Sequence, residues 1–155
     1  MFYVPFWIYM GITVLLAGIT IYLRKFTFID LQVIIMIIAV SMCCDMLFCK
    51  QYKLYHYVDM TMKYVGWYSF WANVIAVPAL GYIFIKFLPS SKKRVWFYML
   101  AWAVAFTLLE IFILKPSGIL HTSSWHTMPW SPIGYFLALV LEYIYFLQLK
   151  KRTVR

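Results

Sequence analysis

The chain has 155 residues, of which 65% are hydrophobic and 12% charged, with a formal net charge of +9. A soluble domain is nearer half apolar and a quarter charged, so the composition excludes a soluble enzyme, a secreted disulfide scaffold and a disordered regulator, and it predicts an integral membrane protein. The basic residues lie between apolar runs without a nucleic-acid-binding motif, so they indicate membrane topology and contact with anionic lipid headgroups, and no nucleic-acid partner is expected.

Five apolar runs follow one another along the chain, each near the roughly 20 residues that a helix needs to cross a bilayer. We expect an all-α integral membrane bundle of five transmembrane helices, forming a single domain over residues 1–155, because the runs lack the alternation of a β-barrel. The expected spans are about 2–23, 31–49, 65–88, 95–114 and 132–149. The first run lacks the basic segment of a signal peptide, so we expect it to remain as an anchor.

Two prolines bear on the helix boundaries. Pro78 lies inside the third run, where we expect it to kink the helix but not to end it, because neighbouring helices can bond the freed carbonyl. The fifth run is the shortest. We expect it to begin with Ser131 as the N-cap and Pro132 as the first helical residue.

The distribution of basic residues predicts the orientation of the bundle. Ten of the 14 Lys and Arg residues lie at the ends of the first, third and fifth runs that would share one side of the membrane. Lys86 is counted among them because its long side chain can snorkel to that interface. Cytoplasmic loops carry the excess of basic residues, so we expect the N-terminus outside the cell and the C-terminus in the cytoplasm.

Two segments on the predicted outer side differ from plain loops. Residues 51–64 place apolar side chains at helical spacing, which predicts an amphipathic turn or helix in the membrane interface. Asp59 and Lys63 would form an i,i+4 ion pair on it. Residues 116–132 are rich in Ser, Thr, His and Trp, and the tryptophans are suited to anchor this segment in the interface.

Three carboxylates lie inside the predicted spans: Asp45, Glu110 and Glu142. Each would cost a few kcal/mol if it faced lipid, so we expect all three to face the bundle interior. Asp45 and Glu110 lie four residues before the outer ends of their runs, about 6 Å deep at 1.5 Å per residue. Glu142 lies nearer the middle of its run.

One interpretation of these carboxylates is structural. Asp45 and Glu110 would bond to cationic and amide side chains as contacts between helices. Those candidate partners are Lys50, Lys115 and Asn73. Glu142 has a hydroxyl on either side of it along its run, at Tyr135 and Tyr145, and both are candidate donors to its carboxyl group.

Two functional interpretations remain beside the structural one. Asp45 and Glu110 could line an outward-facing pocket for a small molecule, ion or metal, or Glu110 and Glu142 could mark a proton or ion path. The remaining candidate residues of the pocket are polar or aromatic side chains near the outer side: Asn73, His56, His121, Trp125, His126 and Trp130. The spacing of the histidines matches no metal-binding motif, so we assign no metal ligand.

The sequence assigns no catalytic residue and no cofactor. Ser123, Ser124 and His126 lie close together, but without a nucleophile elbow. An enzyme acting on lipid, with Glu110 and His126 as acid and base, would lack the usual nucleophile or metal signature. The three cysteines fall in one apolar run, which predicts small buried side chains and not disulfides.

Several features from the third run onward carry a resemblance. They are the aromatic residues 67–70 followed by Pro78, the basic turn at 92–94, Glu110 late in the fourth run, and the His- and Trp-containing segment 121–130. In this layout the chain resembles a group of small uncharacterised five-helix integral membrane proteins of spore-forming Firmicutes. The resemblance implies a multi-pass protein of the bacterial cell membrane and brings no known activity.

Taken together, the sequence predicts a non-enzymatic multi-pass membrane protein that works with a membrane partner or as a homo-oligomer. The reason is that no loop is large enough to build an external catalytic domain. The alternative is a small-molecule, ion or metal binder or transporter that uses the outward-facing pocket around Asp45 and Glu110. A membrane enzyme acting on lipid is the least favoured interpretation.

Overall fold

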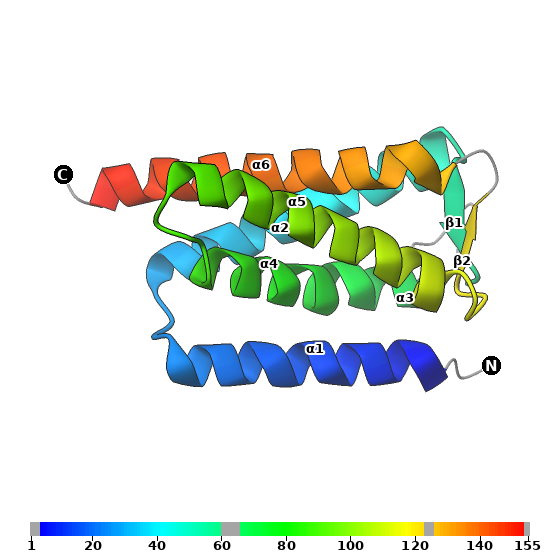
Figure 1. Cartoon of the computed structure of the whole chain (residues 1–155). Helices are drawn as coiled ribbons and strands as arrows, with labels where there is room; N and C mark the ends of the chain where they lie inside the picture. The colour runs from blue at the N-terminus through cyan, green and yellow to red at the C-terminus, as the bar shows by residue number, and fades with distance from the viewer. Residues whose placement is uncertain (1–3, 60–65, 123–125, 154–155) are drawn as a thin grey trace.

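The computed structural model describes residues 4–59, 66–122 and 126–153. Within these ranges the chain is largely helical, and one pair of short strands joins two connecting segments (Figure 1). Five helices in this part of the chain are long and apolar enough to cross a membrane. The predicted all-α fold, with five helices of membrane-spanning length and composition, is therefore confirmed.

The elements follow the predicted spans closely. The first span is α1 (Val4–Leu23), and the second is α2 (Phe28–Asp45) continued by the π-helical segment η1 (Met46–Gln51). The third span consists of α3 (Trp67–Trp71), π-helical η2 (Ala72–Ala76) and α4 (Val77–Lys86). The fourth is α5 (Lys92–Leu109) with π-helical η3 (Glu110–Leu114), and the fifth is α6 (Thr127–Thr153). The strands are β1 (Tyr55–Tyr57) and β2 (Leu120–Thr122).

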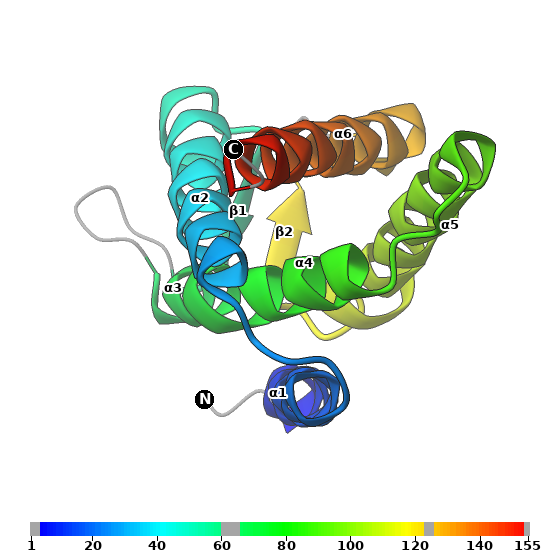
Figure 2. The same ribbon diagram turned by 90° about the vertical axis from the view of Figure 1, so that its left-hand side faces the viewer.

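Successive spans run antiparallel, and α4 occupies a central position (Figures 1 and 2). Viewed along the helices, α1 packs beside α4, while α2, α5 and α6 lie on the other side of it (Figure 2). We call the end of the bundle that holds β1 and β2 the strand end. The opposite end, with the turns that follow Leu23 and Lys86, is called the basic end because most of the Lys and Arg residues gather there.

The interior face of each helix repeats every three or four residues, as an amphipathic helix requires. On α5 and η3 this face is formed by the buried residues Val95, Met99, Ala103, Thr107 and Glu110. On α6 it includes Leu139, Glu142 and Leu149. The intramembrane carboxylates therefore lie on interior stripes, as the cost of exposing them to lipid predicts.

Over residues 52–59 the segment after η1 does not form the interfacial helix that the sequence predicts, and residues 60–64 lie outside the described residues. The backbone turns at Lys53 (φ 51°) and then forms β1, in which Tyr55 and Tyr57 are half-buried and His56 is exposed. This two-residue alternation is that of a strand. The strand forms because β2 supplies backbone partners, with His56 directly opposite His121 in the antiparallel ladder.

The predicted ion pair between Asp59 and Lys63 is untested, because Lys63 lies outside the described residues. Asp59 instead accepts a hydrogen bond from the backbone N–H of Tyr68 over 3.0 Å. Tyr68 is the second residue of α3, whose N-cap Gly66 has no side chain to offer. Asp59 therefore satisfies one of the free amides that every helix start leaves.

The last span begins earlier than predicted, so the assignment of Ser131 as N-cap is wrong. The backbone of Met128 is extended (φ −101°, ψ 129°), and the chain is helical from Pro129 onward. Pro132 consequently lies inside α6. Both prolines are close to the helix start, where a missing backbone N–H costs little.

As expected, the third span continues through Pro78. It lies at the start of α4, directly after the π-helical turn η2. The backbone N–H of Val77 donates to the carbonyl of Ala72, five residues earlier. The wider π turn thus accompanies the position at which proline removes an ordinary helical hydrogen bond.

Candidate functional site

Four carboxylates are buried in the bundle, and they form three separate environments. Asp45 is 6% exposed and Glu110 is 2% exposed, both near the strand end. Glu142 is 6% exposed, and Asp30, which sequence analysis did not single out, is 3% exposed. A buried carboxylate needs hydrogen-bond donors or a cation, so the partners of each group indicate what it does.

Asp45 accepts hydrogen bonds on both of its oxygens. The hydroxyl of Tyr55 donates to Oδ1 over 2.7 Å. The hydroxyl of Ser69 and the amide Nδ2 of Asn73 each donate to Oδ2 over 2.6 Å. One side chain thus connects α2 with β1, α3 and η2, and the expected contact between Asp45 and Asn73 is confirmed.

Glu110 is held in the same manner by α6. The hydroxyl of Tyr135 donates to Oε2 over 2.9 Å, and that of Thr127 donates to Oε1 over 3.2 Å. The ammonium group of Lys115 donates to the hydroxyl oxygen of Thr127. Lys115 therefore reaches the Glu110 carboxylate through Thr127 and not by the direct contact that the sequence suggests.

Both tyrosines of β1 lie close enough to Asp45 to feel its charge. Burial raises the pKa of Tyr57 well above its ordinary value, and the charge of Asp45 followed by the phenol of Tyr135 acts in the same direction. Burial also raises the pKa of Tyr55, with the charge of Asp45 as the second cause. Both phenols therefore stay protonated at neutral pH, and the Tyr55 hydroxyl remains available as a donor to Asp45.

The three π-helical segments lie in the strand-end halves of their spans, beside these polar side chains. Asp45 directly precedes η1, Asn73 lies inside η2, and Glu110 begins η3. A π turn inserts an extra residue into a helix and so re-aims the side chains that follow. We call Asp45, Tyr55, Ser69, Asn73, Glu110, Thr127 and Tyr135 the strand-end polar cluster.

The structure does not bring the other predicted pocket residues to this cluster. His56 and His121 stack on each other with ring centroids 5.3 Å apart, and both are exposed on the far side of the strands from Tyr55. His126 and Trp130 are also exposed. Trp125 lies outside the described residues. In the part of the chain that the structure describes, no three His, Cys, Asp or Glu side chains form a group that could hold a metal ion.

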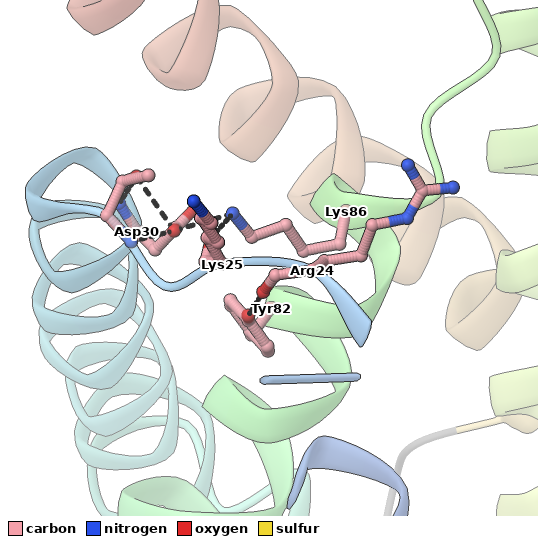
Figure 3. Close-up of polar contacts among 6 residues, drawn as sticks. Arg24, Lys25, Asp30, Tyr82 and Lys86 are labelled. Atoms are coloured by element: carbon pink, nitrogen blue, oxygen red, sulfur yellow. Dashed lines mark hydrogen bonds and ion pairs between the residues drawn. The ribbon is translucent and has the colours of Figure 1, made fainter. Parts of the chain in front are cut away.

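Asp30 belongs to a second polar site, at the basic end (Figure 3). Its Oδ2 atom lies 2.7 Å from Nζ of Lys86 and also accepts the backbone N–H of Thr27 over 2.6 Å. Lys86 donates to the carbonyl of Lys25 over 2.9 Å, and the Tyr82 hydroxyl donates to the carbonyl of Arg24 over 3.2 Å. These contacts tie the turn between α1 and α2 to α4.

The sequence contained a signal for this site. Thr27 and Asp30 have the spacing of a capping box, in which the N-cap and N3 side chains bond to each other's backbone, and the structure forms that box. Lys86 was expected to snorkel to the interface. Its side chain is instead only 14% exposed, because it pairs with Asp30.

Glu142 is bonded differently from the other three carboxylates. Tyr135, one of its two expected donors, bonds to Glu110 instead. Among the described residues, no hydrogen-bond partner reaches Oε1 of Glu142. A Cβ atom added to Gly81 would lie 3.0 Å from Oε1 and 3.2 Å from Oε2 of Glu142. The carboxyl group therefore packs against the glycine backbone of α4.

No protein-family model matches the chain, and no curated protein and no solved structure is significantly similar to it. The contacts of the buried polar groups are thus the basis for a functional assignment. Side chains of this chain donate to Asp45, Glu110 and Asp30. Oε1 of Glu142 has no donor among the described residues.

Proposed function

We propose that the chain is a non-enzymatic multi-pass protein of the cell membrane, with its strand end outside and its basic end in the cytoplasm, and that it works as an assembly with copies of itself or with another membrane protein. The observation that carries this proposal is the occupancy of Asp45, whose two oxygens accept three hydrogen bonds from the same chain. A carboxylate whose oxygens are already bonded to side chains of other elements is suited to holding those elements together.

The same observation weighs against a binding pocket at the strand end. A ligand or metal on Asp45 or Glu110 would have to displace buried hydrogen bonds, and those made to a charged group contribute about 1.5–3 kcal/mol each. The histidines and Trp130, which would complete such a pocket, are exposed and lie apart from the cluster. An outward-facing pocket is therefore the weaker alternative.

An enzyme acting on lipid has less support. His126, the base that such a reaction would use, is exposed, whereas Glu110 is buried and already bonded to Tyr135 and Thr127. The connections between spans are also short, the longest described ones running from Gln51 to Trp67 and from Leu114 to Thr127. They leave no room for a separate catalytic domain.

The helix surfaces support assembly in the membrane. On α1, the buried residues Phe6, Met10, Thr13 and Thr20 form one narrow stripe, while large apolar residues such as Ile12 and Leu15 are exposed. In a bilayer, such faces contact lipid or another transmembrane helix. The orientation is supported by the gathering of basic residues at one end of the bundle.

Native mass spectrometry of the gently solubilised protein tests the proposal. We expect a defined oligomer or a stoichiometric complex with a membrane partner, and the same stoichiometry in the variant Cys43→Ser, which changes an exposed thiol on α2. A monomer carrying a bound small molecule that is lost in Asp45→Asn would contradict the proposal and support the pocket. A reporter fused to the C-terminus that is active only outside the cell would contradict the orientation.

A further inference from the structure

Glu142 lies where three helices meet in the interior of the bundle. It projects from α6 toward Gly81 of α4, and Ile37 of α2 fills the space beside that glycine. The apolar core around it includes Val33, Phe84 and Leu139. A carboxyl group in such surroundings is expensive, and residues of this kind inside a membrane mark ion or proton pathways by default.

Among the described residues, no cation is paired with the Glu142 carboxyl group, and the ammonium group of Lys86 is paired with Asp30. Because Oε1 also has no hydrogen-bond partner among the described residues, an ionised Glu142 would be a buried, uncompensated charge. The neutral acid avoids most of that cost, so a proton is the ligand that this site fits best.

Other polar groups lie above and below Glu142 along the bundle. Tyr135, bonded to Glu110, is seven residues away on α6 toward the strand end, a rise of about 10 Å at 1.5 Å per residue. Lys86, paired with Asp30, is five residues from Gly81 on α4 toward the basic end, about 8 Å. Glu142 is thus the middle member of a series that runs from one end of the bundle to the other.

Two tyrosines on the neighbouring helices α5 and α4 are committed elsewhere. Tyr98 of α5 interacts electrostatically with Glu142, but its hydroxyl donates to the carbonyl of Phe84 over 3.3 Å. Tyr82 of α4 donates to the carbonyl of Arg24. The cysteines of α2 and η1 lie toward the strand end. Among the described residues around the site, Glu142 is therefore the group best placed to accept and release a proton.

We propose that Glu142 is a proton-binding site in the middle of the membrane, and that protons pass through it between the strand-end polar cluster and the Asp30–Lys86 pair. A proton arriving from the strand end binds one oxygen of the Glu142 carboxylate and forms the neutral acid. It leaves to the Asp30 carboxylate and then to water at the basic end. Lys86 keeps its proton throughout, so each passage moves one positive charge across the membrane.

Direct transfer is not possible over gaps of about 8–10 Å, so water molecules must bridge them transiently. Because Gly81 has no side chain, the Glu142 carboxyl group and Ile37 pack directly against the backbone of α4. The role of Glu142 does not depend on the assembly proposed above, because the polar series lies within one chain. Proton flux and oligomeric state can therefore fail independently.

The test is a proton-flux measurement on the purified protein in liposomes that contain a pH-sensitive dye, with a potassium gradient and valinomycin as the driving force. We expect the internal pH to change at least tenfold faster with the wild-type protein than in protein-free liposomes. Glu142→Gln should reduce the rate to that of protein-free liposomes. The control Gln148→Leu, at an exposed position of the same helix, should keep the wild-type rate.

Three results would overturn the proposal: a wild-type rate no faster than that of empty liposomes, a Glu142→Gln rate equal to wild type, or a flux of sodium ions without protons. Infrared spectroscopy keeps the test decisive if Glu142→Gln does not fold. The wild-type protein should show the carbonyl absorption of a protonated carboxylic acid at neutral pH, shifted by transfer to D₂O. The absence of that band from the wild type would equally overturn the proposal.

Discussion

The hydroxyl of Tyr135 donates a hydrogen bond to Oε2 of Glu110 over 2.9 Å. This contact joins the fourth span to the fifth at the strand end. It also takes from Glu142 a donor that lies on its own helix, seven residues away. One tyrosine therefore accounts for two properties of the bundle: Glu110 is held, and Glu142 is left to pack against Gly81.

Removing this donor should destabilise the protein. We expect Tyr135→Phe to lower the free energy of unfolding by about 1.5–3 kcal/mol, the usual contribution of a hydrogen bond to a charged group. Thermal unfolding in detergent measures the change. Tyr145→Phe on the same helix serves as the control and should stay close to wild type, and an equal loss in both variants would show that the Glu110 contact is not the cause.

The pair of Asp30 and Lys86 should be coupled. Lys86→Met leaves Asp30 buried without its cation, and breaking a buried pair in this way costs about 3–5 kcal/mol. Adding Asp30→Asn removes the stranded charge, so the double variant should be more stable than Lys86→Met alone. A double-mutant cycle on unfolding free energies gives the coupling. Strictly additive effects would show that Asp30 and Lys86 do not stabilise the protein through their 2.7 Å contact.

Stability should fall at alkaline pH because of Tyr57. Its pKa in the folded protein is raised by burial and by Asp45, whereas an unfolded tyrosine titrates near pH 10, roughly. The stability that comes from keeping this phenol neutral is therefore complete below about pH 10 and is lost as the pH rises above that value. The free energy of unfolding, measured from about pH 8 to about pH 11, should fall less for Tyr57→Phe than for wild type.

The exposed Tyr52 is the matched control for this pH dependence. Tyr52→Phe removes one phenol without touching the strand-end polar cluster, so its stability should fall with pH as in the wild type. If the decline is unchanged in Tyr57→Phe, the phenol of β1 is not the titrating group.

Gly81 should tolerate no side chain unless its neighbour is trimmed. An added Cβ would press on Cδ1 of Ile37 and lie 3.0 Å from Oε1 of Glu142. We expect Gly81→Ala to lower the melting temperature, since overpacking commonly costs about 1–3 kcal/mol. Ile37→Val removes the crowding Cδ1 atom, so the double variant should lose less than the sum of the two single changes. Full additivity would mean that Gly81 and Ile37 do not pack against each other as described.

The spans and their buried carboxylates could be predicted from the sequence. Apolar runs of bilayer length identified all five helices to within a few residues at most ends, because the bilayer imposes both length and composition. The interior positions of Asp45, Glu110 and Glu142 followed from the cost of exposing a carboxylate to lipid. Asn73 was one of three candidate partners offered for Asp45 and Glu110, beside Lys50 and Lys115, and it is bonded to Asp45.

Pairings between distant segments could not be predicted in this way. Tyr57 pairs with Leu120 across the strand ladder. The spacing of apolar residues in one sequence indicates local structure, but it does not reveal which distant segment is the partner. Asp30 was overlooked because it lies at the very start of its helix, where a capping role is usual. Glu110 and Glu142 differ because Tyr135 bonds to Glu110. Which carboxylate Tyr135 reaches depends on the rotation of α6, and the spacing of apolar residues does not determine that rotation.

The most direct test of this account compares the thermal unfolding of Asp45→Asn, Glu110→Gln and Glu142→Gln under the same conditions. Asp45 and Glu110 are bonded within the chain, so their amide variants turn an acceptor into a donor that faces other donors, and both should melt well below wild type. Glu142→Gln should melt at or above the wild-type temperature, because it removes an ionisable group that has no cation beside it. A Glu142→Gln variant as unstable as the other two, or an Asp45→Asn variant as stable as wild type, would contradict the account.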